Sequence, residues 1–106
     1  MKELLNEIEQ VAKNELARAN AIHPLFNSLH EAYGVLAEEL DEATEALKLT
    51  EEDFDMFFEC VKKNNEKSAY THLEAARNNA LDCAAEMVQV AAMAQKAIDG
   101  IKQKEE

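Results

Sequence analysis

The chain has 106 residues and a formal net charge of −11, because 22 Asp and Glu outnumber 11 Lys and Arg. This length suits a single domain over residues 1–106. The acidic charge disfavours binding to a nucleic acid polymer, which requires a basic surface. With two Gly, one Pro and no Trp, the chain has too few turn residues for a β-sandwich or barrel. We therefore expect an all-α domain.

Three further features of the sequence bear on location. The first residues contain no apolar core of signal-peptide length. The longest apolar stretch, near residues 84–94, is interrupted by Glu86 and Gln89 and is too short to cross a bilayer. Cys60 and Cys83 form no C-x-x-C motif, and two Cys are too few for a disulfide framework. We expect a cytoplasmic protein that does not insert into a membrane, with both thiols free and buried; the alternative for the thiols is a redox pair.

Apolar residues spaced by three and four predict four helices. The first starts near Leu4 and ends by Ile22 or His23, because Pro24 disfavours helical geometry in the residue before it. Pro24 itself suits the first turn of the second helix, which spans about 25–48. This second helix contains Gly34, which either allows a close approach of another backbone or is simply tolerated.

Two more helices follow in the second half of the chain. Thr50 and Asp53 have the spacing of a helix N-terminus, which predicts a third helix that frays around residues 64–65. Its aromatic residues are expected to pack in the core, the alternative being a pocket for a base: Phe54, Phe57 and Phe58. The fourth helix begins at Ser68 or Thr71 and runs to about residue 99, before Gly100. At roughly 1.5 Å per residue it would be about 45 Å long, so we expect it to bend or to pack along a second subunit.

Acidic residues fall on two of these helices in unusual positions. A helical wheel places Glu39 at the edge of the apolar face of the second helix, with Glu42 one turn further on. The fourth helix is apolar on nearly every side, yet Asp82, Glu86 and Gln89 form one polar stripe along it. Like charges brought together repel unless a cation neutralises them, and carboxylate oxygens suit Mg²⁺ or Mn²⁺. The pattern predicts metal-assisted hydrolysis of a phosphoanhydride; the alternative is an ordinary solvated acidic face.

Other chemistries fit the sequence less well. A ferritin-like di-iron site requires Glu-x-x-His pairs, and none of the three His follows a Glu at that spacing. No Gly-rich phosphate loop, Ser/His/Asp order or nucleophilic Cys pattern is present. His30, Gln89 and Asn79 are candidate substrate contacts. Cations for phosphate groups would come from scattered residues: Lys62, Lys63, Lys67, Arg77 and Lys96.

Residues 26–42, which read FNSLHEAYGVLAEELDE, resemble the second helix of the MazG-like, all-α nucleoside triphosphate pyrophosphohydrolases, especially the short phage-type members. Glu38, Glu39 and Glu42 match the family's first motif, E-E-x-x-E. The second motif, E-x-x-D, is best matched by the four residues that start at Glu86. The resemblance covers roughly residues 25–47 and 79–98, and it implies a four-helix MazG-like bundle with a long C-terminal helix, completed by formation of a homodimer or homotetramer.

The resemblance also implies an activity. Such an enzyme uses Mg²⁺ to cleave a nucleoside triphosphate between the α and β phosphates, giving a nucleoside monophosphate and pyrophosphate. Carried over to this sequence, Glu39, Glu42 and Glu86 match metal ligands, with Glu38 beside them. A carboxylate of this cluster, such as Glu38, would orient or deprotonate the attacking water.

Two features depart from the family pattern. Gln89 stands where the family has its second acidic residue, and the gap between the two motifs is longer than usual. Asp82, one turn before Glu86 on the same stripe, could supply the missing carboxylate. A second interpretation belongs to another class: a catalytically silent helical interaction module whose acidic surface docks a basic partner.

Overall fold

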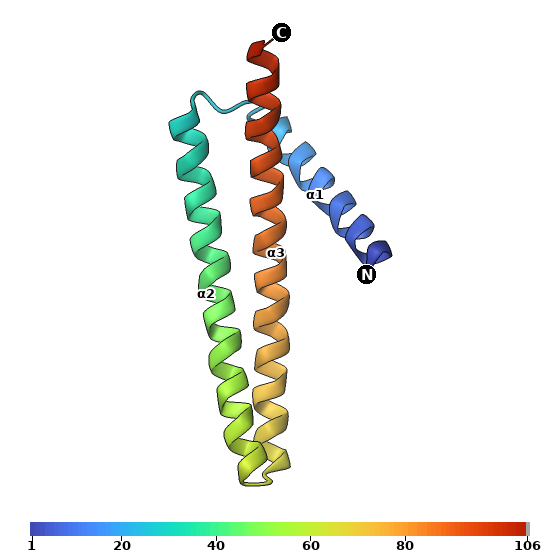
Figure 1. The fold of residues 1–106 in the computed structure, drawn as a ribbon, viewed down its shortest axis with the longest axis vertical. Helices are drawn as coiled ribbons and strands as arrows, with labels where there is room; N and C mark the ends of the chain where they lie inside the picture. The colour runs from blue at the N-terminus through green and yellow to red at the C-terminus, as the bar shows by residue number, and fades with distance from the viewer. Residues whose placement is uncertain (106) are drawn as a thin grey trace. The chain divides into compact units, whose positions relative to one another are not determined.

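The computed structural model describes residues 1–105, which form three α-helices and no strand: α1 (Lys2–Ile22), α2 (Leu29–Lys62) and α3 (Glu66–Glu105) (Figure 1). The all-α prediction is confirmed. The described chain has three helices rather than the predicted four, because the second and third predicted helices are one continuous helix.

The N-terminus of α2 is set by local hydrogen bonds. The helix begins at Leu29, later than predicted, and Pro24 lies in the non-helical segment before it. Ser28 Oγ accepts a hydrogen bond from the backbone N–H of Glu31 at 3.1 Å, while the Glu31 carboxylate accepts bonds from the backbone N–H and the side-chain amide of Asn27 at 3.2 and 3.0 Å. This reciprocal arrangement resembles a capping box. These hydrogen bonds, rather than Pro24, determine where the helix begins.

Thr50 lies inside α2 instead of capping a new helix. Its Oγ1 donates a hydrogen bond to the backbone carbonyl of Ala46, one turn earlier, at 2.9 Å. A Thr hydroxyl can bond to the preceding turn in this way without ending a helix. The spacing that predicted a helix start at Thr50 therefore belongs to an uninterrupted helix.

A short turn connects α2 to α3. Asn64 has a φ of 52°, in the left-handed region that Asn tolerates better than most residues. The next residue, Asn65, accepts a hydrogen bond through Oδ1 from the backbone N–H of Ser68 at 3.1 Å, so α3 begins just after it. At the other end, α3 continues through Gly100, where we predicted its end.

The described residues divide into two compact units. Unit 2, Asp41–Ala85, is an antiparallel hairpin made of the end of α2 and the start of α3 (Figure 1). Asn79 Nδ2 donates a hydrogen bond to Asp53 Oδ2 at 2.6 Å, and Cys83 Sγ donates to the backbone carbonyl of Ala43 at 3.4 Å. The buried side chains of this unit are small: Ala43, Ala46 and Cys60. Small residues let the two helices of the hairpin approach closely.

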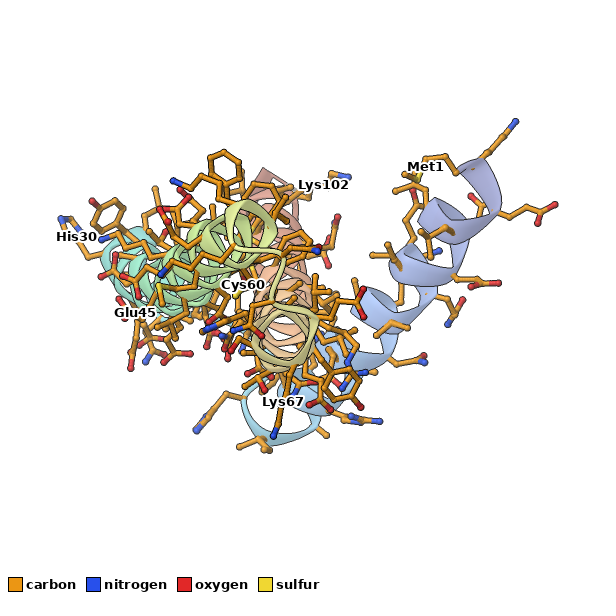
Figure 2. The ribbon with its side chains drawn as sticks, turned by 90° about the horizontal axis from the view of Figure 1, so that it is seen from below. Met1, His30, Glu45, Cys60, Lys67 and Lys102 are labelled. Atoms are coloured by element: carbon orange, nitrogen blue, oxygen red, sulfur yellow. The ribbon has the colours of Figure 1, made fainter. Side chains whose placement is uncertain are left out.

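Unit 1 contains Met1–Leu40 and the part of α3 that starts at Glu86. The end of α1 meets this part of α3, and α1 diverges from α3 toward Met1 (Figures 1 and 2). The buried side chains of unit 1 are Ala32, Ala92, Met93 and Lys96. A side chain at Gly34 would meet no atom within 4 Å of its Cβ apart from the neighbouring backbone of α2. No other described part of the backbone therefore approaches this glycine closely.

Much apolar surface remains exposed on the single chain. Tyr33 is 75% exposed and Leu81 is 63% exposed, and Phe54 and Phe58, which we expected in the core, are also exposed. Both thiols are free; Cys60 is buried, as predicted, whereas Cys83 is half-buried. Within residues 1–105, no helix combines the length and the apolar character needed to span a membrane.

Candidate metal centre

Glu39 is a half-buried carboxylate on α2. It lies seven residues after Ala32 and four before Ala43, both of which are buried. These spacings correspond to whole turns of a helix, so Glu39 shares the face of α2 that packs inward. The wheel prediction for this residue is therefore confirmed.

Glu86 is the second half-buried carboxylate, and it comes from α3. Glu39 and Glu86 both belong to unit 1, and one carboxylate oxygen of each lies within 4.8 Å of the other. Residues far apart in the sequence thus bring two like charges together at a place of reduced solvent access. Such a pair is unfavourable unless a proton or a cation neutralises part of its charge.

Glu42 extends the acidic group along α2. It follows Glu39 by one helical turn, is exposed, and has a carboxylate oxygen within 4.8 Å of that of Glu39. The first motif therefore presents two adjacent carboxylates on one face of the helix. Glu38, the other acidic residue of this motif, is exposed on the side of α2 that does not face inward.

The remaining predicted site residues lie outside this acidic group. Asp82 is exposed on α3. Asn79 is half-buried in unit 2, where its amide bonds to Asp53. His30 is exposed near the start of α2, and its side chain points outward (Figure 2).

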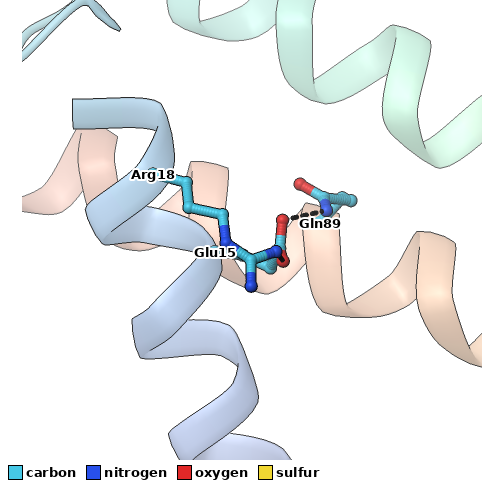
Figure 3. Close-up of polar contacts among 3 residues, drawn as sticks. All are labelled: Glu15, Arg18 and Gln89. Atoms are coloured by element: carbon cyan, nitrogen blue, oxygen red, sulfur yellow. Dashed lines mark hydrogen bonds and ion pairs between the residues drawn. The ribbon is translucent and has the colours of Figure 1, made fainter. Parts of the chain in front are cut away.

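Gln89 is held by a residue that the sequence analysis did not identify. Its Nε2 donates a hydrogen bond to Oε2 of Glu15 at 2.8 Å, and Oε1 of Glu15 accepts from Arg18 Nη1 (Figure 3). Glu15 accepts from one of the two N–H groups of this amide, and the carbonyl oxygen of Gln89 can accept from, or coordinate to, another group. The signal for Glu15 was present in the sequence: it lies four residues after Val11 and four before Ala19 in the apolar series of α1.

The donor set fits a hard divalent cation. Mg²⁺ binds oxygen ligands at about 2.0–2.1 Å in octahedral geometry, so two oxygens on one ion are at most about 4.2 Å apart. The carboxylate oxygens of Glu39 and Glu86, and those of Glu39 and Glu42, lie within 4.8 Å. Small side-chain rotations would bring each pair to the required separation. Carboxylates without His or Cys favour Mg²⁺ or Mn²⁺ over zinc.

We expect Glu15 and Gln89 to be energetically coupled. The Glu15 side chain is only 23% exposed, and a hydrogen bond to a charged acceptor stabilises a protein by about 1.5–3 kcal/mol. In a double-mutant cycle of Glu15→Ala and Gln89→Ala, followed by urea unfolding, the coupling free energy should be about 1–2 kcal/mol.

The exposed pair Gln10 and Asn14, which are hydrogen-bonded at 3.0 Å on α1, provides the matched control. A contact between residues four apart on an exposed helix face contributes only about 0.2–0.5 kcal/mol. A coupling for Glu15 and Gln89 no larger than that of the control pair would show that the bond does not fasten α1 to α3.

No protein-family model matches this chain, and neither does any curated protein or solved structure. The chemistry of the centre is accordingly inferred from its own donors, which are carboxylates of α2 and α3 in unit 1 together with the adjacent Glu42.

Proposed function

We propose that the protein is a Mg²⁺-dependent nucleoside triphosphate pyrophosphohydrolase. One observation carries the proposal: the half-buried carboxylates of Glu39 and Glu86 come from two helices and lie within 4.8 Å of each other. The resemblance of residues 26–42 to the MazG-like enzymes supports the choice of substrate. Water adds to the α–β phosphoanhydride of the nucleotide, the P–O bond breaks, and a nucleoside monophosphate and pyrophosphate leave.

The roles of the residues follow from their positions and chemistry. Glu39, Glu42 and Glu86 hold the metal, and Asp82 on the preceding turn of α3 is a further ligand. When bound, the ion neutralises phosphate oxygens and favours ionisation of an attacking water. Glu38, which is next to Glu39 in the sequence and exposed, is assigned the role of orienting that water or accepting its proton.

Gln89 and His30 complete the proposed site. A neutral amide contributes less charge than the family's carboxylate at position 89, and one N–H group of that amide donates to Glu15. His30 lies nine residues before Glu39 on α2 and is exposed, which suits contact with an outer part of the nucleotide. Asn79 is a weaker candidate, because its amide already bonds to Asp53.

The acidic centre predicts stabilisation by Mg²⁺. A ligand that binds only the folded state at ten times its Kd raises the free energy of unfolding by about 1.4 kcal/mol. Thermal unfolding of the protein should therefore shift upward with MgCl₂, and Glu39→Gln should abolish the shift because it removes a charged ligand.

Glu45→Gln, which removes an exposed carboxylate elsewhere on α2 (Figure 2), is the matched control and should keep the full Mg²⁺ shift. Metal binding would be contradicted if MgCl₂ shifted the thermal unfolding of both variants equally, and by no more than NaCl does at the same ionic strength. That result would favour the second candidate function, an acidic interaction module, which the net charge of −11 and the exposed apolar side chains support.

Catalysis itself is tested by release of pyrophosphate. We expect turnover of at least one member of a panel of ordinary and modified nucleoside triphosphates with Mg²⁺. Glu39→Gln should be inactive, whereas Glu38→Gln should retain the Mg²⁺ shift and lose about 100-fold or more in kcat, because a general base contributes on that scale. If the wild-type protein binds Mg²⁺ but hydrolyses none of these nucleotides, the site has only a binding role.

We also propose that the working form is a cytoplasmic homodimer or homotetramer. Large exposed apolar patches are typical of interaction surfaces, and the two free thiols fit a reducing compartment. Sedimentation at micromolar concentration should give at least twice the mass of the 11.9 kDa chain. Leu81→Glu should lower that mass, because it places a charge on an exposed apolar position; a compact wild-type monomer would contradict the proposal.

A further inference from the structure

A hollow in unit 1 lies between the start of α2 and the last turns of α3. It is a small hollow that is open to solvent on one side, and its lining includes Phe26, Ser28, Lys96, Gly100 and Lys104. We propose that this hollow binds the phosphate group of a small molecule, with Lys96 as the main cation. Lys96 is ten residues after Glu86, or about 15 Å along α3, so this site is separate from the metal centre.

Lys96 is the buried charged residue in the lining of the hollow. Its side chain is only 6% exposed, whereas the other basic residues considered for phosphate contacts are all exposed: Lys62, Lys63, Lys67 and Arg77. Its Nζ lies 4.6 Å from the centre of the Phe26 ring. The ring offers electrostatic attraction but no oxygen acceptor for the three ammonium N–H groups.

The two salt bridges found among the described side chains join Arg18 to Glu15 and Lys62 to Glu59, and neither involves Lys96. Burying an ammonium group without an oxygen partner is costly. Lys96 Nζ is not among the described side-chain atoms that lack both solvent access and a hydrogen-bond partner, so an anion bound in the hollow would replace water as the acceptor of its N–H groups.

The rest of the lining suits an anion with several oxygens. Lys96, Gly100 and Lys104 follow one another at intervals of four along α3, so they lie roughly above one another on one face. Gly100 has no side chain, which leaves space between the two lysines. Two ammonium groups on one side match the double negative charge of a phosphate better than the single charge of a carboxylate.

The start of α2 adds hydrogen-bond donors. Ser28 Oγ accepts a bond from the Glu31 N–H, so its own O–H is available to donate. The first N–H groups of a helix also favour an anion. Glu31 carries the opposing charge at this end of α2, but both of its carboxylate oxygens accept hydrogen bonds from Asn27, which reduces its repulsion of a ligand.

Titration with inorganic phosphate, followed by amide NMR shifts at constant ionic strength, tests the proposal. We expect saturable shifts in residues 28–32 and 96–104. Lys96→Met should weaken binding by at least about tenfold, because charge-assisted hydrogen bonds to phosphate are strong. Lys104→Met should weaken it less, and Lys63→Met, at an exposed lysine, should leave it unchanged.

Further variants keep the test decisive. Gly100→Leu should block binding by filling the hollow without removing a charge, so it replaces Lys96→Met if that variant does not fold. Glu39→Gln should bind phosphate normally, which separates this site from the metal centre. A parallel titration with a nucleoside monophosphate identifies the source of the group: tighter binding than inorganic phosphate indicates a phosphate ester, and equal binding indicates the free anion.

Two results would overturn the proposal. The first is a wild-type response that follows ionic strength rather than phosphate. The second is a response that Lys96→Met and Gly100→Leu both leave intact. The first result includes the case in which a carboxylate of another copy of this chain already covers Lys96, because no phosphate-specific response would then occur.

Discussion

The proximity of two like charges on half-buried positions is the constraint on which the proposed function of this chain depends. Glu39 and Glu86 could each have been placed in solvent at little cost, as most acidic residues of the chain are. Instead their oxygens lie within 4.8 Å, where water screens their repulsion less than at an exposed surface. In the proposed function, a divalent cation would turn this unfavourable contact into a binding site, because the two carboxylates would then share a partner instead of repelling each other.

The all-α class of the fold was predicted correctly from the sequence, but the number of helices and their boundaries were not. The all-α prediction followed from periodicity and the lack of turn residues. The break at Thr50 was predicted from a capping pattern, although the apolar spacing resumes in the same register after the polar residues 50–53, through Phe54, Phe57 and Val61. Where a capping pattern and a helical apolar period that keeps its register disagree, the period is the stronger indication, because it reflects packing contacts along the whole helix. The start of α2 shows the opposite case: Ile22, Leu25 and Leu29 keep the helical spacing, yet the Glu31 N–H donates to Ser28 Oγ and the helix begins at Leu29.

The carboxylates of the site were more predictable than their neighbours. Glu39 and Glu86 could be found from the helical wheel, since a charge on an apolar face is visible in one helix at a time. Glu15 and Lys96 could not be assigned partners in this way. The bond of Glu15 to Gln89 depends on how α1 meets α3, and the burial of Lys96 depends on Phe26 from the segment before α2. Both contacts join parts of the chain whose relative position no periodicity specifies.

The positions of Gln89 and Lys96 on α3 have a consequence for how this chain can change in length. They are seven residues apart, which is about two helical turns, so both project toward their partners from one face. A single inserted or deleted residue between them would rotate one relative to the other by about 100° and remove either the bond to Glu15 or the contact with Phe26. The number of residues in this stretch is therefore restricted, and only an insertion close to a whole number of turns would preserve both contacts.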